Sequence, residues 1–179
     1  MSKEEGYRIA VLGGGAWGTA LALAMLRAGH EVMLWARDAA TVDAIGRGEN
    51  PRYLPGIVFE PGIKATTDLG MALSGAHCVL AVVPAQSLRA VLGEAKEHMP
   101  AAAPLVLCAK GIERASGELL SAVVAEILPH NPVAALSGPS FAADVARGLP
   151  TAVVVAARDE ALSADLAQRF SALNLRCYS

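Results

Sequence analysis

A glycine-rich segment directly after a short apolar run constrains this chain most. The sequence GGGAWG at residues 13–18 matches the G-x-G-x-x-G pattern of dinucleotide-binding β-α-β units, and it follows the strand predicted at residues 8–12. In such a unit Gly13 would allow the tight turn, Gly15 the approach of a pyrophosphate, and Gly18 the packing of helix on strand. The N-terminus of the helix would then face the anion. The alternative is a glycine turn that serves packing alone.

Short apolar runs alternate with amphipathic helical runs along the rest of the chain. The predicted strands cover residues 8–12, 31–36, 63–65, 78–83, 105–108, 133–137, 151–157 and 174–178. The predicted helices cover residues 17–28, 38–47, 67–73, 87–98, 118–128, 141–147 and 160–173. Glycine, proline and asparagine recur over residues 46–62, which indicates a loop. This alternation predicts an α/β, Rossmann-type fold: a doubly wound, mostly parallel sheet with helices on both faces.

The composition excludes several classes of protein. Of the 179 residues, 54% are hydrophobic and 18% are charged, which excludes intrinsic disorder. The net charge of −2 comes without a basic stretch, so we expect no nucleic-acid partner. The longest apolar run, residues 76–84, is shorter than the ~20 residues of a membrane span. Residues 1–6 carry charges in place of an apolar leader, so we expect no signal peptide.

The cysteines and histidines show no spacing typical of a metal or redox site. Cys78, Cys108 and Cys177 are odd in number and far apart, which fits a reducing compartment, so we expect a cytoplasmic protein. Cys78 and Cys108 lie in apolar runs, where free thiols are usually core side chains. The histidines, which we expect to be structural or solvated, are His30, His77, His98 and His130. No metal site is predicted.

The end of the second predicted strand should set the choice between NAD and NADP. An NAD site usually has an acidic residue there for the ribose hydroxyls, whereas an arginine accommodates the 2′-phosphate of NADP. Here Arg37 and Asp38 follow the strand. Arg37 offers a planar fork of donors to a phosphate, and Asp38 could be no more than the N-cap of the next helix. We therefore expect NADP in preference to NAD; the alternative is a solvated surface arginine.

Two further strand ends carry residues suited to anionic ligands. Ligands bind at the carboxyl ends of parallel strands in this architecture. Lys110 follows a buried strand and could bind a substrate phosphate or polarise a carbonyl oxygen. Gly138 and Ser140 precede a short predicted helix and offer a second anion site. The alternatives are a surface lysine and an ordinary N-cap serine.

Several segments, in order along the chain, resemble those of bacterial NAD(P)-dependent glycerol-3-phosphate dehydrogenases. They are GGGAWGTA at residues 13–20, NPRYLPG at 50–56, VVP at 82–84, KGIE at 110–113, LSGPSFA at 136–142 and GLPT at 148–151. Each is modest by itself, but the ordered series is specific, and the likeness extends over residues 7–179.

The resemblance implies that dihydroxyacetone phosphate is reduced to sn-glycerol 3-phosphate by NADPH or NADH, for phospholipid synthesis. Family positions that contact the cofactor are matched by Ala16, Trp17, Arg37, Lys110 and Ala142. Family positions that contact the substrate are matched by Lys110, Gly138 and Ser140. Lys110 is thus the candidate catalytic residue, which would bind substrate and stabilise charge.

The resemblance also implies a single NAD(P)-binding domain over residues 1–179. In the family a helical second domain follows and supplies the lysine that donates the proton, and no segment of this sequence matches it. We therefore expect the isolated chain to bind cofactor with little or no turnover. A homodimer is one option for the longer protein. Two alternatives stay open: a related dehydrogenase of the 3-hydroxyacid or 6-phosphogluconate type, and a non-catalytic NADPH-binding module.

Overall fold

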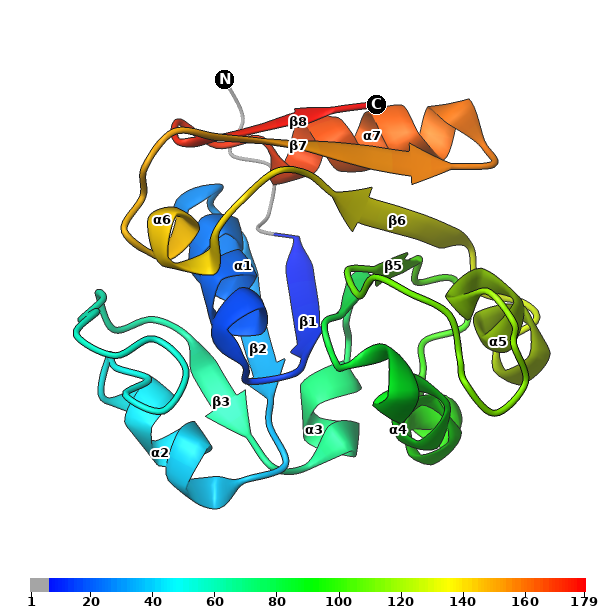
Figure 1. The fold of residues 1–179 in the computed structure, drawn as a ribbon, viewed down its shortest axis with the longest axis horizontal. Coiled ribbons are helices and arrows are strands. Elements are labelled where there is room, and N and C mark those ends of the chain that lie inside the picture. Colours follow the sequence, from blue (N-terminus) through cyan, green and yellow to red (C-terminus); the bar gives the residue numbers. More distant parts are fainter. Residues whose placement is uncertain (1–6) are drawn as a thin grey trace.

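One eight-stranded sheet with helices packed on both faces makes up the part of the chain that the computed structural model describes, residues 7–179 (Figure 1). Residues 1–6, which carried the expectation of no signal peptide, lie outside the described residues. Within residues 7–179, none of the helices has the length and apolar character needed to cross a membrane.

The strand order is β3-β2-β1-β4-β5-β6-β7-β8. The strands are β1 (Arg8–Leu12), β2 (Glu31–Trp35), β3 (Lys64–Thr66), β4 (Cys78–Ala81), β5 (Leu105–Leu107), β6 (Val133–Ser137), β7 (Thr151–Ala157) and β8 (Leu175–Tyr178). Neighbouring strands are parallel except β6 and β7, which are antiparallel. The predicted α/β, mostly parallel, doubly wound sheet is confirmed. The order reverses between β1 and β4, where ligands bind in such sheets.

Seven α-helices connect these strands within residues 7–179. They are α1 (Ala16–Arg27), α2 (Ala39–Gly46), α3 (Leu69–Leu73), α4 (Leu88–Ala95), α5 (Leu120–Ile127), α6 (Ala142–Ala146) and α7 (Glu160–Phe170). Two 3₁₀ turns, η1 (Ala85–Ser87) and η2 (Lys96–His98), flank α4, so the helix predicted at 87–98 is shorter and bounded by tighter turns.

The helix predicted at residues 160–173 also ends early, at Phe170. The reason is the side chain of Ser171, whose hydroxyl donates to the Ala167 carbonyl at 2.8 Å and accepts from the Cys177 N–H at 3.1 Å. This residue has an extended conformation, with ψ of 128°. Serine side chains that bond to the backbone compete with helix continuation, and here the bond leads the chain into β8.

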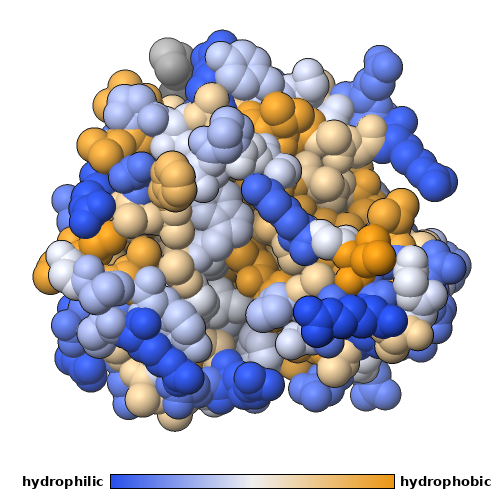
Figure 2. Space-filling view, viewed as in Figure 1, coloured by the Kyte–Doolittle hydropathy of each residue, from blue (hydrophilic) through white to orange (hydrophobic). Residues whose placement is uncertain are grey.

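Side chains of β1 alternate between the two faces of the sheet and so divide the core into two clusters. Ile9 and Val11 belong to a cluster with α1, α2, α6 and α7, whereas Ala10 and Leu12 belong to one with α3, α4 and α5. On the face shown in Figure 2, hydrophobic residues reach the surface in small patches separated by hydrophilic ones. The described chain therefore buries its apolar side chains on both faces of the sheet, as a doubly wound fold requires.

Candidate functional site

A cavity of about 750 Å³ lies where the order of the strands reverses. Its walls are the glycine turn after β1, the residues at the end of β2, and the segments that follow β4 and β5, together with Arg52 and Tyr53 from a loop. This is the edge of the sheet formed by the carboxyl ends of the strands, where the sequence predicted the ligand site. The cavity is of a size that holds small-molecule ligands.

The three fingerprint glycines occupy positions where a side chain would conflict with the backbone or fill the cavity edge. Gly13 has φ of +129°, and a Cβ there would lie 2.8 Å from the Val82 carbonyl oxygen. A Cβ on Gly18 would overlap the carbonyl oxygen of Gly13. Gly15 meets nothing within 4 Å and lines the cavity, so its backbone is open to a ligand. These geometries agree with the turn, packing and approach predicted for Gly13, Gly18 and Gly15.

The N-terminus of α1 is available for an anion. Gly15 is the N-cap of this 12-residue helix, and no side chain caps it. Ala16 and Trp17 form the first turn and both line the cavity. The free N–H groups and the positive end of the helix dipole would face a pyrophosphate in this position. The residues present thus fit a dinucleotide: a turn without Cβ atoms, leading into an uncapped helix.

Arg37 and Asp38, at the end of β2, have different surroundings. Asp38 is the N-cap of α2: its Oδ2 accepts from the N–H of Thr41 at 3.1 Å and from its hydroxyl at 2.7 Å. The cap predicted for Asp38 is confirmed, and the Thr41 hydrogen bond holds the pKa of Asp38 below its usual value. Arg37 is exposed, lines the cavity and makes no hydrogen bond or ion pair with the rest of residues 7–179. Its guanidinium is therefore available to a ligand.

A loop after α2, whose role in the site sequence reasoning missed, reaches the same wall. Asn50 is 1% exposed, and its Nδ2 donates to the carbonyl of Gly14 at 3.0 Å and to the hydroxyl of Thr19 at 2.8 Å. This tether brings Arg52 and Tyr53 to the cavity. The NPRYLPG segment marked the loop in the sequence, but no local pattern indicated where it would lie.

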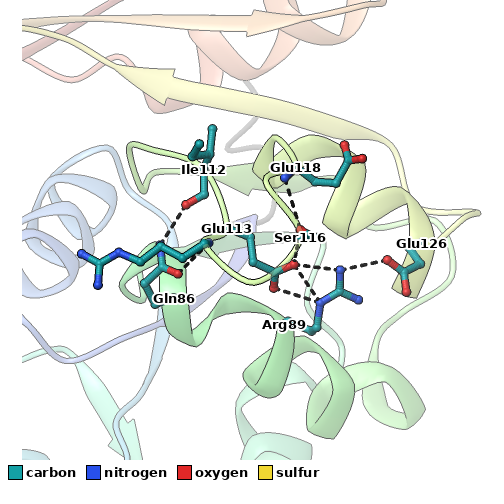
Figure 3. A network of polar contacts seen from close by, with 8 residues as sticks. Gln86, Arg89, Ile112, Glu113, Ser116, Glu118 and Glu126 are labelled. Carbon is teal, nitrogen blue, oxygen red and sulfur yellow. Dashed lines mark hydrogen bonds and ion pairs between the residues drawn. The ribbon is translucent and has the colours of Figure 1, made fainter.

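Lys110 lies on the opposite side of the cavity, in the loop after β5, and it is exposed. A side-chain amide fixes the residues that follow it: Gln86 donates from Nε2 to the Ile112 carbonyl at 2.8 Å and accepts from the Arg114 N–H at 2.9 Å (Figure 3). The loop of Lys110 is thus joined to the segment after β4, which lines the cavity as well.

A buried carboxylate anchors the same loop (Figure 3). Arg89 of α4 donates to both oxygens of Glu113, with Nε–Oε1 at 2.9 Å and Nη2–Oε2 at 3.0 Å, and it also pairs with Glu126 at 2.9 Å. The Glu113 side chain is only 8% exposed and accepts from the Ser116 hydroxyl as well. Hydrogen bonds from Arg89 hold the pKa of Glu113 below its usual range, and its own partners raise the pKa of Arg89. The sequence showed Glu113 only as a carboxylate without a partner nearby.

The predicted residues after β6 do not reach the cavity wall. Gly138, Ser140 and Ala142 are absent from its lining. A Cβ on Gly138 would lie 2.9 Å from the Ala152 carbonyl oxygen, so this glycine permits close packing on β7. The reading of Ser140 as an N-cap is wrong, because Phe141 occupies that position of α6 and no side chain caps the helix. The structure therefore brings together Gly13, Gly15, Ala16, Trp17, Arg37 and Lys110, but not the β6 residues.

The cysteines and two of the histidines have structural surroundings. Cys78 and Cys108 are buried, and burial raises the pKa of both thiols. His77 accepts the Arg8 N–H at its Nδ1, and Nε2 of His30 lies 2.7 Å from the Arg169 carbonyl oxygen. Among residues 7–179, no group of three or more histidine, cysteine or acidic side chains is placed to hold a metal ion.

Comparison with known proteins identifies close relatives. The family model described as NAD-dependent glycerol-3-phosphate dehydrogenase N-terminus matches residues 8–163. The chain is 76% identical over 176 residues to glycerol-3-phosphate dehydrogenase (NAD(P)+) of Mesorhizobium japonicum, covering 98% of the chain and 51% of that protein. It is 62% identical to the protein of that name from Chelativorans sp., covering 97% and 53%. The chain thus spans about half the length of the curated relatives it matches.

Solved structures agree with this similarity. The crystal structure of glycerol-3-phosphate dehydrogenase from Coxiella burnetii superposes with a TM-score of 0.88 at 40% identity, covering 97% of the chain and 53% of that structure. Glycerol-3-phosphate dehydrogenase from Plasmodium falciparum gives a TM-score of 0.86 at 27% identity, covering 98% and 53%. The similarity to both covers nearly the whole chain and about half of each structure.

Proposed function

The chain belongs to the NAD-dependent glycerol-3-phosphate dehydrogenase family, and on that premise we infer that it is the cofactor-binding half of an enzyme that reduces dihydroxyacetone phosphate to sn-glycerol 3-phosphate. NADPH or NADH is the reductant. The observation that supports this most is the cavity itself, which the glycine turn, Arg37 and Lys110 line together. A phosphate-bearing dinucleotide needs contacts of these kinds at this edge of the sheet.

The charge of the cavity suits this ligand. Its lining carries the cations Arg37, Arg52 and Lys110 against a single carboxylate, that of Asp38, which caps a helix. A dinucleotide brings negative charge at its pyrophosphate, and NADP adds a 2′-phosphate. Electrostatic complementarity of this kind favours both the capture and the orientation of a polyanion.

Each wall has its own part in the reaction. The turn at Gly13 and Gly15 and the first turn of α1, with Ala16 and Trp17, bind the pyrophosphate, and Arg37 binds the adenosine end. The bound cofactor supplies the hydride. Lys110 holds the substrate phosphate or stabilises the negative charge that develops on the carbonyl oxygen. The resemblance places the proton donor, a lysine, in the half of the relatives that follows Ser179.

The residues after β6 complete the proposal. Gly138 and Ser140 are proposed substrate contacts and Ala142 a cofactor contact. What supports this is that β5 and β6 are parallel neighbours, so the segments that hold Lys110 and Gly138 start from the same edge of the sheet. Since neither Gly138 nor Ser140 lines the cavity, a substrate that touched them would extend beyond its present wall.

The wider setting follows from the same family premise. The whole protein would act in the cytoplasm, as a homodimer, and supply sn-glycerol 3-phosphate for phospholipid synthesis. Residues 1–179 would form its NAD(P)-binding domain. The match to the family disfavours the 3-hydroxyacid and 6-phosphogluconate types of dehydrogenase, whereas a non-catalytic module is an outcome that the following experiment separates.

The test compares this chain with one extended to the length of its relatives. Both are titrated with NADPH and NADH, and then assayed with dihydroxyacetone phosphate by the absorbance of the reduced nicotinamide. We expect both to bind cofactor and only the longer one to approach ordinary turnover of about 10 per second. Loss of acid catalysis alone costs about 10²–10⁴-fold. An ordinary rate from residues 1–179 would contradict the division into halves, and no rate from the longer chain would favour the non-catalytic module.

A further inference from the structure

Arg52 lies close to the residue that ends β2, although it comes from a different part of the chain. Its Nη1 is 3.7 Å from Oδ2 of Asp38, and its side chain lines the same cavity as Arg37. In this fold the end of the second strand is where the adenosine ribose is read. Arg37 and Arg52 therefore bring two guanidinium groups to that position from two separate segments.

The loop that carries Arg52 is anchored on both sides of it. Before Arg52, the Asn50 side chain is bonded to Gly14 and Thr19, and its carbonyl accepts the Leu54 N–H at 2.7 Å. After it, the side chain of Leu54 is buried in the core. The backbone of Arg52 is thus held against the glycine turn while its own side chain is 66% exposed.

The contacts of Arg52 orient it without consuming its donors. The distance of 3.7 Å to Asp38 is longer than a charge-assisted hydrogen bond, which is about 2.7–2.9 Å. Its guanidinium lies 5.2 Å from the centre of the Tyr53 ring, and Tyr53 also lines the cavity. The planar fork of Arg52 therefore keeps free N–H donors beside the ribose position.

Asp38 is poorly placed to select NAD. Its Oδ2 already accepts two hydrogen bonds from Thr41 and faces Arg52, so much of its acceptor capacity is committed to the helix cap. Arg37 has no partner among residues 7–179. The position thus presents two cations with free donors and one neutralised carboxylate, which suits a dianionic phosphate better than two ribose hydroxyls.

We propose that Arg52 is a second arginine for the 2′-phosphate of NADP and, with Arg37, sets the preference for NADPH over NADH. This proposal rests on the proposed function, because it requires the adenosine end of a dinucleotide at the end of β2. It adds a determinant from the loop after α2 to the one expected at the strand end.

The test measures dissociation constants for NADPH and NADH by calorimetry on this chain and three variants. Arg52→Gln removes the charge, and Arg52→Lys keeps the charge but removes the fork. Arg47→Gln is the matched control, because Arg47 is equally exposed at 64%, pairs only with Glu49 at 3.5 Å and does not line the cavity. Thermal unfolding of each variant checks that it folds. Adenosine 2′,5′-bisphosphate and 5′-AMP serve as probes without the nicotinamide half.

We expect Arg52→Gln to weaken NADPH and the bisphosphate about tenfold and to leave NADH and 5′-AMP within twofold. Arg52→Lys should be intermediate and Arg47→Gln unchanged. Equal binding of NADPH by the Arg52→Gln variant and the unchanged chain would overturn the proposal. An equal weakening of NADPH and NADH would overturn it too, since the arginine would then serve the whole ligand. Failure of the unchanged chain to bind either cofactor would instead contradict the proposed function.

Discussion

The two walls of the cavity are held in place by different kinds of interaction. On the wall of β1 and α1, backbone meets backbone: a side chain on Gly13 or Gly18 would strike main-chain atoms. On the wall of Lys110, long side chains do the work, with Gln86 and the Arg89–Glu113 pair joining loops far apart in the sequence. The first wall is therefore sensitive to volume and the second to charge and pH.

This difference has a functional rationale. A pyrophosphate bound by N–H groups requires the main chain itself at the ligand, and only a turn without Cβ atoms leaves it room. A reacting carbonyl requires a charged group at a set distance, which a lysine on a loop provides once the loop is braced. Four substitutions test this contrast, from the largest expected effect to the smallest.

Gly18→Ala should cause the largest loss, because its Cβ would overlap the Gly13 carbonyl oxygen and force the helix away from the turn. We expect the free energy of unfolding to fall by about 3 kcal/mol, as for overpacked cores, with loss of cofactor binding. Urea unfolding measures it. Gly93→Ala in α4 is the control: a Cβ there meets nothing within 4 Å, so the substitution should stabilise by about 0.5–1 kcal/mol. Equal stabilities of the two variants would contradict the backbone account.

Arg37→Asp should affect the ligand and not the fold, because Arg37 is exposed and makes no contact of its own within residues 7–179. A charge-assisted contact to phosphate contributes about 1.5–3 kcal/mol, so NADPH affinity should fall about tenfold to a hundredfold. NADH affinity and the unfolding temperature should change little. The same weakening for both cofactors would remove Arg37 from the choice between them.

Glu113→Gln should loosen the second wall, with a smaller loss of stability than Gly18→Ala. The substitution removes the charge that pairs with Arg89 but keeps the size of the side chain. We expect a lower unfolding temperature and faster hydrogen exchange over residues 110–119, with NADPH binding reduced only modestly. Glu118→Gln is the control, since the Glu118 carboxylate has no partner in the described part of the chain. Exchange that is unchanged at those residues would show that the pair does not brace the loop.

The smallest effect concerns pH. Hydrogen bonds from Arg89, and then from Ser116, hold the pKa of Glu113 below its ordinary value of 4.5. A lowered pKa means that the unfolded chain takes up this proton first, so the stabilisation is complete above pH 4.5 and declines as pH falls through the lowered value. Glu126 shifts in the same direction for the same reason. Unfolding of Glu113→Gln should accordingly depend less on acid pH than unfolding of the unchanged chain; parallel curves would rule the pair out as the source.

Local patterns in the sequence were enough for much of the fold and for one wall of the site. The strands at 8–12 and 133–137, the cap at Asp38 and the separate parts of Gly13, Gly15 and Gly18 all depend on residues within one β-α unit. Periodicity, capping and turn chemistry act over a few residues, so they can be read without the tertiary structure. Binding by these residues is still a prediction that the titrations test.

Only the tertiary structure decided how the distant segments meet. Arg89 and Glu113 are 24 residues apart and Asn50 is 36 from Gly14, and no spacing in the sequence announces either pair. The antiparallel pairing of β7 with β6, the early end of α7 at Ser171 and the distance of Ser140 from the cavity wall were likewise outside the local patterns. The physical reason is that such contacts form only when packing of the two core clusters brings separate loops to one edge of the sheet, and side-chain partners are then chosen by proximity in space.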